Sequence, residues 1–275
     1  MVSLIATGSG DLACDDATGR VVWRVGYIPE PWAWTPWQYA TDGRFTGRWD
    51  DPDGIWRTLY VGDTRLACYL EVLAPFRADP HLAAQLDDID EDPADTTAYP
   101  TTAMGALPTR WREPRLIGSA NLTGWYVLPA DKQSLPTLRG RFLALAVHHR
   151  LPDVDAAAIR LAEPRALTQA IAGWIYQQTG PTGLPIGGVH FDSRHGDRLD
   201  LRAVFERPGD GTTSPRPPPA SPGCSKTPSR STTPTFRKHC ASTDCTGPPD
   251  TRNIVTRPDS AIRYRPTGRC SRDRR

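Results

Sequence analysis

The sequence predicts a single mixed α/β (α+β) domain followed by a disordered tail. Short runs rich in β-branched and aromatic residues alternate with segments of helical period, and these runs lie at residues 21–27, 58–61, 188–191 and 199–205. After residue 206 the composition changes abruptly to proline, serine, threonine and arginine. We therefore expect a flexible N-terminal arm (residues 1–20), a domain (residues 21–206) that contains an acidic insert (residues 77–112), and a disordered tail (residues 207–275).

Net charge separates the domain from the tail. Residues 207–275 carry 14 Lys and Arg against 5 Asp and Glu, whereas residues 1–206 carry 19 against 26. The mildly acidic domain does not favour nucleic acid, because nucleic-acid phosphates select basic surfaces. A basic tail that touches nucleic acid stays an alternative, although aromatic residues are not interleaved with its charges.

The sequence carries no signal for export or membrane insertion. Gly8 to Asp11 interrupt the apolar N-terminal stretch, and no basic region precedes it. No run approaches the about 18 apolar residues of a spanning helix. Of six cysteines only Cys14 and Cys68 precede the tail, so the pattern does not indicate a disulfide framework. We expect a cytoplasmic protein.

The first predicted strand, at residues 21–27, carries a candidate ligand-binding arginine. Alternation places Trp23 and Val25 on one face and Arg24 on the other. If the second face lines a pocket, Arg24 is available to an anionic ligand; if it faces water, Arg24 is a solubilising charge. Six of the nine tryptophans follow between residues 23 and 56. They indicate core and loop anchoring, with a stacking platform for bases or sugars as the alternative.

Residues 43–54 combine two further arginines with a tight turn. Arg44 and Arg48 lie four residues apart, and residues 50–54 supply the Pro and Gly that a chain reversal needs.

A predicted helix after the strand at 58–61 carries a candidate catalytic carboxylate. Asp63 is expected to cap this helix, which begins at Thr64. Glu71 lies at the edge of its apolar face, where a carboxylate is partly desolvated and costly to leave without a partner. The simpler interpretation is a surface glutamate whose stem covers the core.

The middle of the chain contains an acidic insert followed by several short apolar segments. The acidic insert lacks the spacing and glycine of a calcium loop, so we expect a solvated loop or lid. Strands are expected around residues 115–117 and 125–128, interrupted at Gly118. Residues 142–148 form a buried strand or a short helix by periodicity alone.

The last part of the domain predicts a helix and a two-stranded unit. Pro164 opens a helix with apolar residues at 3.6 spacing, and Gly180 stands at its C′ position. The loop between the last two strands contains Ser193 and His195. Because His190 and His195 have no third ligand at suitable spacing, we expect no metal.

The order of these motifs resembles the RES domain family, named for an Arg, a Glu and a Ser. The resemblance spans residues 20 to 206, and the family's Gly-Gly-Arg-Trp-Asn motif is altered at Thr46 and Asp50. It is carried by Trp23-Arg24-Val25, Gly47-Arg48-Trp49, Leu59-Tyr60-Val61, Leu70-Glu71-Val72, Ala166-Leu167-Thr168-Gln169-Ala170-Ile171 and Asp192-Ser193-Arg194-His195-Gly196.

This resemblance implies a fold similar to that of the ADP-ribosyltransferase toxins and an activity on NAD. The resemblance further implies a toxin that depletes NAD and is inhibited by an antitoxin with an Xre-like DNA-binding domain, as in many members of the family. Cleavage of the nicotinamide–ribose bond gives the sugar oxocarbenium character and needs a nearby carboxylate. Glu71 and Arg24 are the candidate catalytic residues.

The remaining candidate residues would bind the dinucleotide. Guanidinium groups form paired hydrogen bonds with phosphate oxygens. We therefore expect Arg24 and Arg48 to bind the pyrophosphate, with Arg44 as the alternative. The Tyr60 ring would stack on nicotinamide or ribose. Ser193 would hydrogen-bond the ligand or hold Glu71 in place, and Thr168 is a second candidate for a polar contact.

Several functions stay open at this point. One is NAD cleavage with water (glycohydrolase) or phosphate (phosphorylase) as acceptor. Another is ADP-ribosyl transfer to a protein or nucleotide, and a third is a non-catalytic nucleotide- or sugar-binding module. Ser193 lacks the Gly-x-Ser-x-Gly elbow of serine hydrolases, and no Gly-x-Gly-x-x-Gly follows a strand, which disfavours hydride transfer.

The tail, residues 207–275, is expected to be disordered, because it cannot bury enough apolar surface to offset the entropy of ordering. Its arginine excess and scattered cysteines also resemble a GC-rich reading frame translated out of phase. Re-reading the coding DNA in the neighbouring frames tests that hypothesis.

Overall fold

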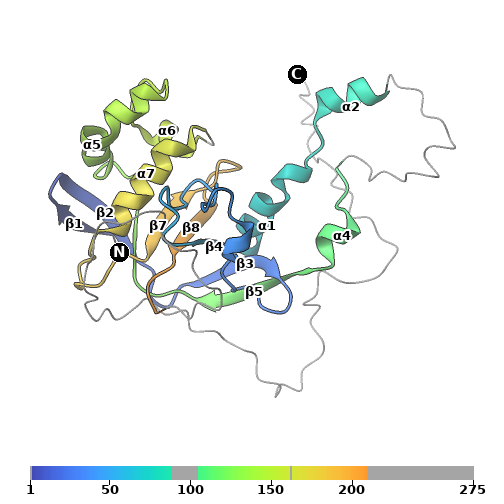
Figure 1. Cartoon of the computed structure of the whole chain (residues 1–275), viewed down its shortest axis with the longest axis horizontal. Coiled ribbons are helices and arrows are strands. Elements are labelled where there is room, and N and C mark those ends of the chain that lie inside the picture. The colour runs from blue at the N-terminus through green and yellow to red at the C-terminus, as the bar shows by residue number, and fades with distance from the viewer. Residues whose placement is uncertain (1, 88–104, 162, 210–275) are drawn as a thin grey trace, which may run out of the picture.

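The computed structural model describes residues 2–87, 105–161 and 163–209, which form a mixed α/β domain around one eight-stranded sheet (Figure 1). The strands are β1 Val2–Thr7, β2 Gly10–Asp16, β3 Val21–Tyr27, β4 Thr58–Gly62, β5 Arg115–Asn121, β6 Trp125–Val127, β7 Gly188–Asp192 and β8 Asp200–Phe205. The helices are η1 Trp37–Tyr39, α1 Arg65–Leu73, η2 Ala74–Phe76, α2 Pro80–Asp87, α4 Thr109–Arg112, α5 Leu135–His148, α6 Ala156–Arg160 and α7 Arg165–Tyr176.

Strand order in the sheet is β1-β2-β6-β7-β8-β4-β3-β5. The β6–β7 pair is parallel and the other pairs are antiparallel. Because Gly62 pairs with Leu201, the end of β4 lies beside the start of β8. The backbone N–H of Asp63 also donates to the carbonyl of Asp200 at 3.0 Å. This register brings the β7–β8 loop next to the start of α1.

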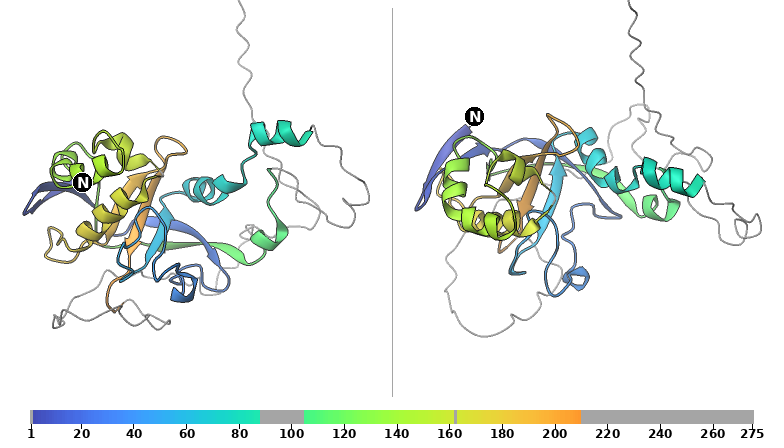
Figure 2. Two further views of the ribbon diagram at one scale, coloured as in Figure 1. Left: turned by 45° about the horizontal axis from the view of Figure 1, so that its top comes forward. Right: turned by 90° about the horizontal axis from the view of Figure 1, so that it is seen from above.

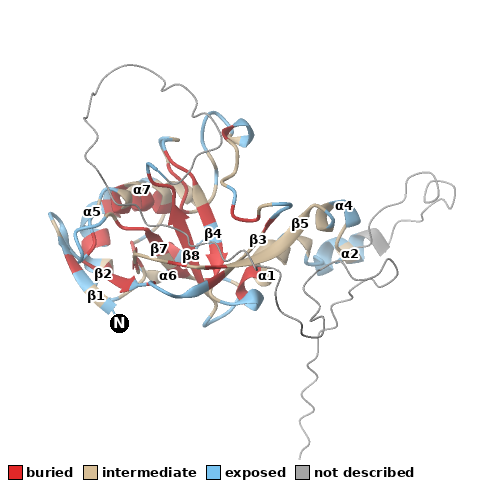
Figure 3. Cartoon of the chain, turned by 90° about the horizontal axis from the view of Figure 1, so that it is seen from below, coloured by how far each residue is buried: buried red, intermediate tan, exposed pale blue. Residues whose placement is uncertain are grey.

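The two faces of the sheet carry separate cores. Helices α5, α6 and α7 lie together over the β2–β7–β8 part of the sheet (Figure 1), where Ala203 and Phe205 of β8 point toward them. Val204 points to the other face, which Trp32 covers. Buried residues are concentrated in α7 and in strands β4, β7 and β8 (Figure 3). Helices α2 and α4 extend away from this body (Figure 2).

Most of the elements with strong periodic patterns are confirmed. Strands β3, β4, β7 and β8 and helix α7 occupy the expected segments. Residues 142–148, for which periodicity left a buried strand and a short helix as alternatives, belong to α5. The structure differs at two glycines: β5 continues through Gly118, and α7 ends at Tyr176, before Gly180.

The prediction of a flexible arm at residues 1–20 is wrong. Residues 2–16 form the β1–β2 hairpin, and β2 pairs with β6 through Cys14 and Val127. Leu12 and Cys14 are fully buried. The Ser134 hydroxyl of the α5 N-cap accepts a hydrogen bond from the Ala13 backbone N–H at 2.9 Å. The hairpin is therefore ordered by partners more than 100 residues away in the chain.

The expected helix cap at Asp63 is also wrong. Thr64 is the N-cap of α1, and its hydroxyl accepts from the Ala67 backbone N–H at 3.1 Å. Asp63 instead forms ion pairs with Arg20 and with the fully buried Arg202. Because its carboxylate binds these two guanidinium groups, Asp63 does not cap the helix.

Only parts of the predicted insert and tail are described. In the insert, α2 and α4 are helical, while residues 88–104 lie outside the described residues. The tail was expected to be disordered from residue 207, but Arg207 is buried, and its guanidinium donates to the carbonyls of Tyr176 and Ile186, so the domain continues through this residue. Residues 210–275 of the predicted tail lie outside the described residues. In the parts of the chain that the structure describes, no helix is long and apolar enough to cross a membrane.

Candidate functional site

Glu71 is held by Ser193, which comes from the other end of the domain sequence. Helix α1 lies close against β4, since a Cβ at Gly62 would be 2.9 Å from the Cys68 backbone nitrogen. Ser193 is 4% exposed, and its hydroxyl donates to Glu71 Oε1 at 2.5 Å. In turn it accepts from the His195 backbone N–H at 2.9 Å. This contact agrees with the second of the two roles expected of Ser193, holding Glu71 in place.

Arg48 lies near Glu71 on the loop before β4. Its guanidinium carbon is 4.6 Å from the centre of the Phe191 ring, and Nη1 donates to the Arg160 carbonyl at 3.0 Å. Burial lowers the pKa of Arg48, and the nearby charges of Arg194 and Arg165 act in the same direction, while Glu71 opposes them. Within the described residues Arg48 forms no ion pair.

Tyr60 holds the Arg48 loop through its hydroxyl. That hydroxyl donates to Asp50 Oδ1 at 2.9 Å and accepts from the Trp49 backbone N–H at 2.8 Å. A Cβ at Gly47 would be 2.5 Å from both the Tyr60 hydroxyl and Asp50 Oδ2, so the loop requires glycine there. Burial and the neighbouring Asp50 raise the pKa of Tyr60. The hydroxyl is buried, whereas Tyr60 as a whole residue is 36% exposed.

A cavity of about 240 Å³ lies between β3 and β4, which pair only through Trp23 and Gly62. Arg24 lines this cavity, and its Nη1 donates to the Pro31 carbonyl. Burial lowers the pKa of Arg24 to about 10. The full lining is Arg24, Val25, Thr35, Phe45, Asp50, Arg57, Thr58, Tyr60 and Val72.

Glu71 and Arg48 lie outside the lining of this cavity but adjoin it. Val72, the neighbour of Glu71, lines the wall, and Tyr60 lies within electrostatic reach of Arg48. Arg24 and Glu71 both interact electrostatically with Cys68, one helical turn before Glu71. The structure thus brings Arg48, Glu71 and Ser193 close together near the β4–α1 junction, with Tyr60 between Arg48 and the cavity that Arg24 lines.

Two predicted site residues are not part of this neighbourhood. Arg44 is exposed, and its Nη1 donates to the Pro52 carbonyl at 3.3 Å within its own turn. Thr168 is 2% exposed, and its hydroxyl donates to the Arg165 carbonyl at 3.1 Å inside α7. The Thr168 hydroxyl is thus occupied inside α7, and Arg44 forms no hydrogen bond or ion pair with Arg48, Tyr60, Glu71 or Ser193 among the described residues.

Several basic residues near the site were not predicted from the sequence. Arg165, at the start of α7, donates to the Thr46 carbonyl, and Gln169 one turn later donates to the Gly47 carbonyl at 2.9 Å. Helix α7 therefore supports the Arg48 loop directly. Arg194 follows Ser193 in the β7–β8 loop. Its position next to a predicted site residue was the sequence signal that could have identified it.

Two other arginines are neutralised by carboxylates. Arg57 lines the cavity, but it forms a buried bidentate pair with Glu206, with Nη2 to Oε1 at 2.6 Å and Nε to Oε2 at 2.8 Å. Arg202 is fully buried and pairs with Asp15, at 2.9 Å, and with Asp63.

The aromatic-rich segment serves mainly as core. Trp32, Trp37, Trp49 and Trp56 are each less than 10% exposed, which removes them from an exposed stacking platform. His190, considered above as a metal ligand, lies between Asp15 and Asp200 at 3.2 and 3.3 Å. Among the described residues no group of three His, Cys, Asp or Glu side chains is arranged to hold a metal.

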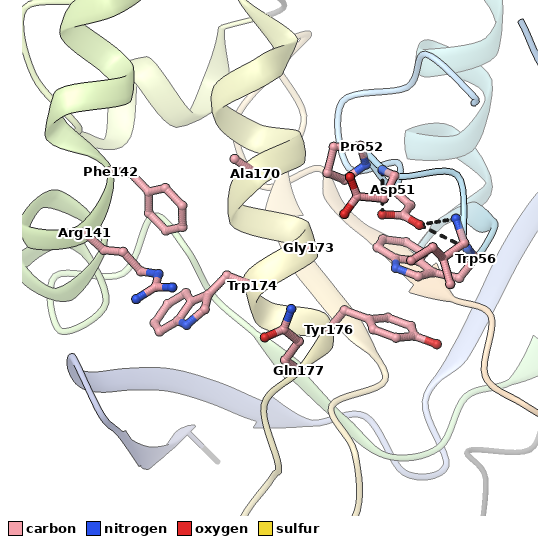
Figure 4. A pocket seen from close by; sticks show the side chains of 12 residues that line it. Asp51, Pro52, Trp56, Arg141, Phe142, Ala170, Gly173, Trp174, Tyr176 and Gln177 are labelled. Carbon is pink, nitrogen blue, oxygen red and sulfur yellow. Dashed lines mark hydrogen bonds between the residues drawn. The ribbon is translucent and has the colours of Figure 1, made fainter. Parts of the chain in front are cut away.

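A larger cavity of about 420 Å³ lies elsewhere, between α5, α7 and the turn at residues 51–56 (Figure 4). None of the predicted site residues lines it. The Asp51 carboxylate in its wall already accepts three backbone N–H groups, from Asp53, Ile55 and Trp56. We therefore take the β4–α1 junction, where carboxylate and guanidinium groups keep free hydrogen-bonding capacity, as the candidate site.

Comparison with known proteins yields no relative: no family model matches the chain, and neither does a curated protein or a solved structure.

Proposed function

We propose that the protein breaks the nicotinamide–ribose bond of NAD, as a RES-like enzyme with a fold related to the ADP-ribosyltransferase toxins. The observation that carries the proposal is the position of Arg48, a partly buried guanidinium without a carboxylate ion pair among the described residues, near the Ser193-bound carboxylate of Glu71. A guanidinium that is not paired with a carboxylate keeps its charge for an anionic ligand.

The basic groups around Arg48 support a dinucleotide as the ligand. Arg165 and Arg194 both lie within electrostatic reach of Arg48. Arg24 lines the adjoining cavity and is hydrogen-bonded to a carbonyl. A pyrophosphate carries two negative charges, and it would relieve the mutual repulsion of Arg48, Arg165 and Arg194. The partly exposed Tyr60, which lines the cavity, would offer the face of its ring to nicotinamide or ribose.

The chemistry assigns one role to Glu71. When the bond between ribose C1′ and the nicotinamide nitrogen breaks, its electron pair goes to the ring, and nicotinamide leaves uncharged. Positive charge then develops on the ribose, and the Glu71 carboxylate stabilises it electrostatically. The same carboxylate accepts the proton of an attacking water, or orients a phosphate, as the new C1′–O bond forms.

The RES resemblance also supports a biological setting. The protein would act in the cytoplasm as the toxin of a toxin–antitoxin pair, inhibited by an Xre-like antitoxin. ADP-ribosyl transfer to a protein or nucleotide would use the same residues with a different acceptor.

The test is incubation of the purified full-length protein with NAD, with and without phosphate, followed by chromatography and mass spectrometry. We expect free nicotinamide together with ADP-ribose, or with phosphorylated ADP-ribose when phosphate is the acceptor. ADP-ribose attached to a protein would identify a transferase. Binding of NAD without nicotinamide release would reject the enzyme in favour of a binding module.

A further inference from the structure

His195 faces the carboxylate oxygen of Glu71 that Ser193 leaves free. Its Nε2 lies 4.0 Å from Glu71 Oε2, and the imidazole is 12% exposed. On the opposite side of the ring, Nδ1 lies 3.3 Å from Nη1 of Arg77, which follows η2. The imidazole therefore stands between a guanidinium and the proposed catalytic carboxylate.

The Arg77 contact determines where the imidazole carries its proton. A guanidinium has only N–H donors, so Nδ1 of His195 must accept with its lone pair. A neutral imidazole that accepts at Nδ1 carries its hydrogen on Nε2, the atom nearest to Glu71. A doubly protonated imidazole would present N–H groups to Arg77 and lose this hydrogen bond.

We propose that His195 is a positioning residue for Glu71, held by Arg77 as the neutral Nε2–H tautomer so that it donates to the second carboxylate oxygen. The role in catalysis rests on the proposed function, whereas the tautomer does not. Ser193 fixes Oε1, and His195 fixes Oε2 when the 4.0 Å gap shortens in the substrate complex. A neutral donor orients the carboxylate and leaves its charge available to the ribose.

The charges around His195 favour the neutral form. Burial lowers its pKa, and Arg77, Arg194 and Arg48 act in the same direction, while Glu71 opposes them. Acidification would protonate His195. The resulting imidazolium would pair with the Glu71 carboxylate and cancel the negative charge that the reaction needs. Loss of Arg77 should raise the pKa of His195 and move this inhibition to higher pH.

Nitrogen-15 NMR of the full-length protein tests the tautomer without reference to activity. At pH 7.5 we expect His195, assigned through the loss of its signals in His195→Gln, as the Nε2–H tautomer, and we expect Arg77→Gln to raise its pKa. Arg110→Gln, which removes an exposed guanidinium from α4, is the matched control and should change neither. An Nδ1–H or doubly protonated His195 at pH 7.5, or an unchanged pKa in Arg77→Gln, overturns the proposal.

Kinetics test the link to Glu71. If the wild-type protein releases nicotinamide, His195→Ala should lower kcat by about tenfold or more with little change in KM. His195→Gln, whose amide can still donate, should retain most of the rate, and the acid limb of kcat should move to higher pH in Arg77→Gln only. Equal losses in Ala and Gln variants reject the donor role. If the wild type releases no nicotinamide, the proposed function fails, and the NMR result still decides the tautomer.

Discussion

Replacing Glu71 with Gln removes one charge from the site and leaves its shape. Ser193, 2.5 Å from Oε1, can still donate to the amide oxygen, so the α1–loop contact persists. A unit charge about 4 Å from the developing positive charge contributes about 4 kcal/mol at an effective dielectric constant of about 20. Since about 1.4 kcal/mol corresponds to a tenfold change in rate, we expect kcat to fall by about 10³-fold.

NAD affinity should respond differently from turnover. The carboxylate acts on charge that exists only in the transition state, so Glu71→Gln should change the Kd for NAD by less than about threefold. Nicotinamide release measured by chromatography gives the rate, and calorimetry gives the affinity. Glu113→Gln, which makes the same change at the end of α4, is the control and should match the wild type.

The reasoning is refuted by a folded Glu71→Gln variant whose kcat lies within about tenfold of the wild type. A charge at the proposed distance would contribute more than that. The carboxylate would then be structural, as a surface glutamate that anchors the loop through Ser193.

Four further predictions concern ligand binding and stability. Arg48→Ala should raise KM for NAD by about tenfold or more with only a small change in melting temperature, because the partly buried Arg48 has no ion pair among the described residues and its folded-state contacts are one carbonyl and neighbouring aromatic rings; equal KM values would exclude it from the site. Tyr60→Phe should lower the free energy of unfolding in urea by about 1–2 kcal/mol, since two hydrogen bonds of its hydroxyl are lost. Glu206→Gln should cost about 3–5 kcal/mol by the same measurement, because Arg57 keeps a buried charge without its carboxylate; a loss below about 1 kcal/mol would contradict this. Although burial acts in the opposite direction, a neighbouring imidazole and guanidinium hold the pKa of Asp15 below its usual value of 3.8. The ionised Asp15 therefore contributes its full stabilisation above pH 3.8, and this contribution is lost as the pH falls further. Thermal melts of the wild type and of Asp15→Asn across pH 2–6 test this, because the difference between their melting temperatures should shrink at the acidic end.

Local sequence signals were sufficient to predict the strands and helices that carry the site. They were not sufficient to predict which of these elements contact one another in the fold. The alternation in β3 and β4 and the 3.6 period of α7 are properties of short segments, and all three elements form where expected. Glu71 and Ser193 are 122 positions apart, and their contact depends on the register of β8 against β4. The sequence suggested the pair only through a resemblance in motif order.

The β1–β2 hairpin shows why the remaining fold was missed. Its glycines and aspartates are typical of loops, and Gly10 adopts a positive φ of 126° at the turn. The signal for order lies in α5: the Thr137 hydroxyl donates to the Asp11 carbonyl at 2.7 Å, and a Cβ at Gly10 would be 2.5 Å from that hydroxyl. A segment stabilised by a helix 126 positions away has no local pattern that distinguishes it from a loop.

The arginines of this domain take their roles from partners that the sequence does not bring near. Arg57 and Arg202 would rank with Arg48 as candidate anion-binding residues by residue type alone. The fold gives each of them a buried carboxylate, 149 positions away for Arg57 and 187 positions away for Arg202. A buried guanidinium that is paired in this way has its charge compensated, and removal of the partner is costly. Arg48 donates to one carbonyl and packs on the Phe191 ring, and among the described residues it forms no ion pair, although Glu71 lies within electrostatic reach. Burial lowers its pKa. Because desolvating a cation that is not directly paired is unfavourable, an anionic ligand at Arg48 would recover part of that cost.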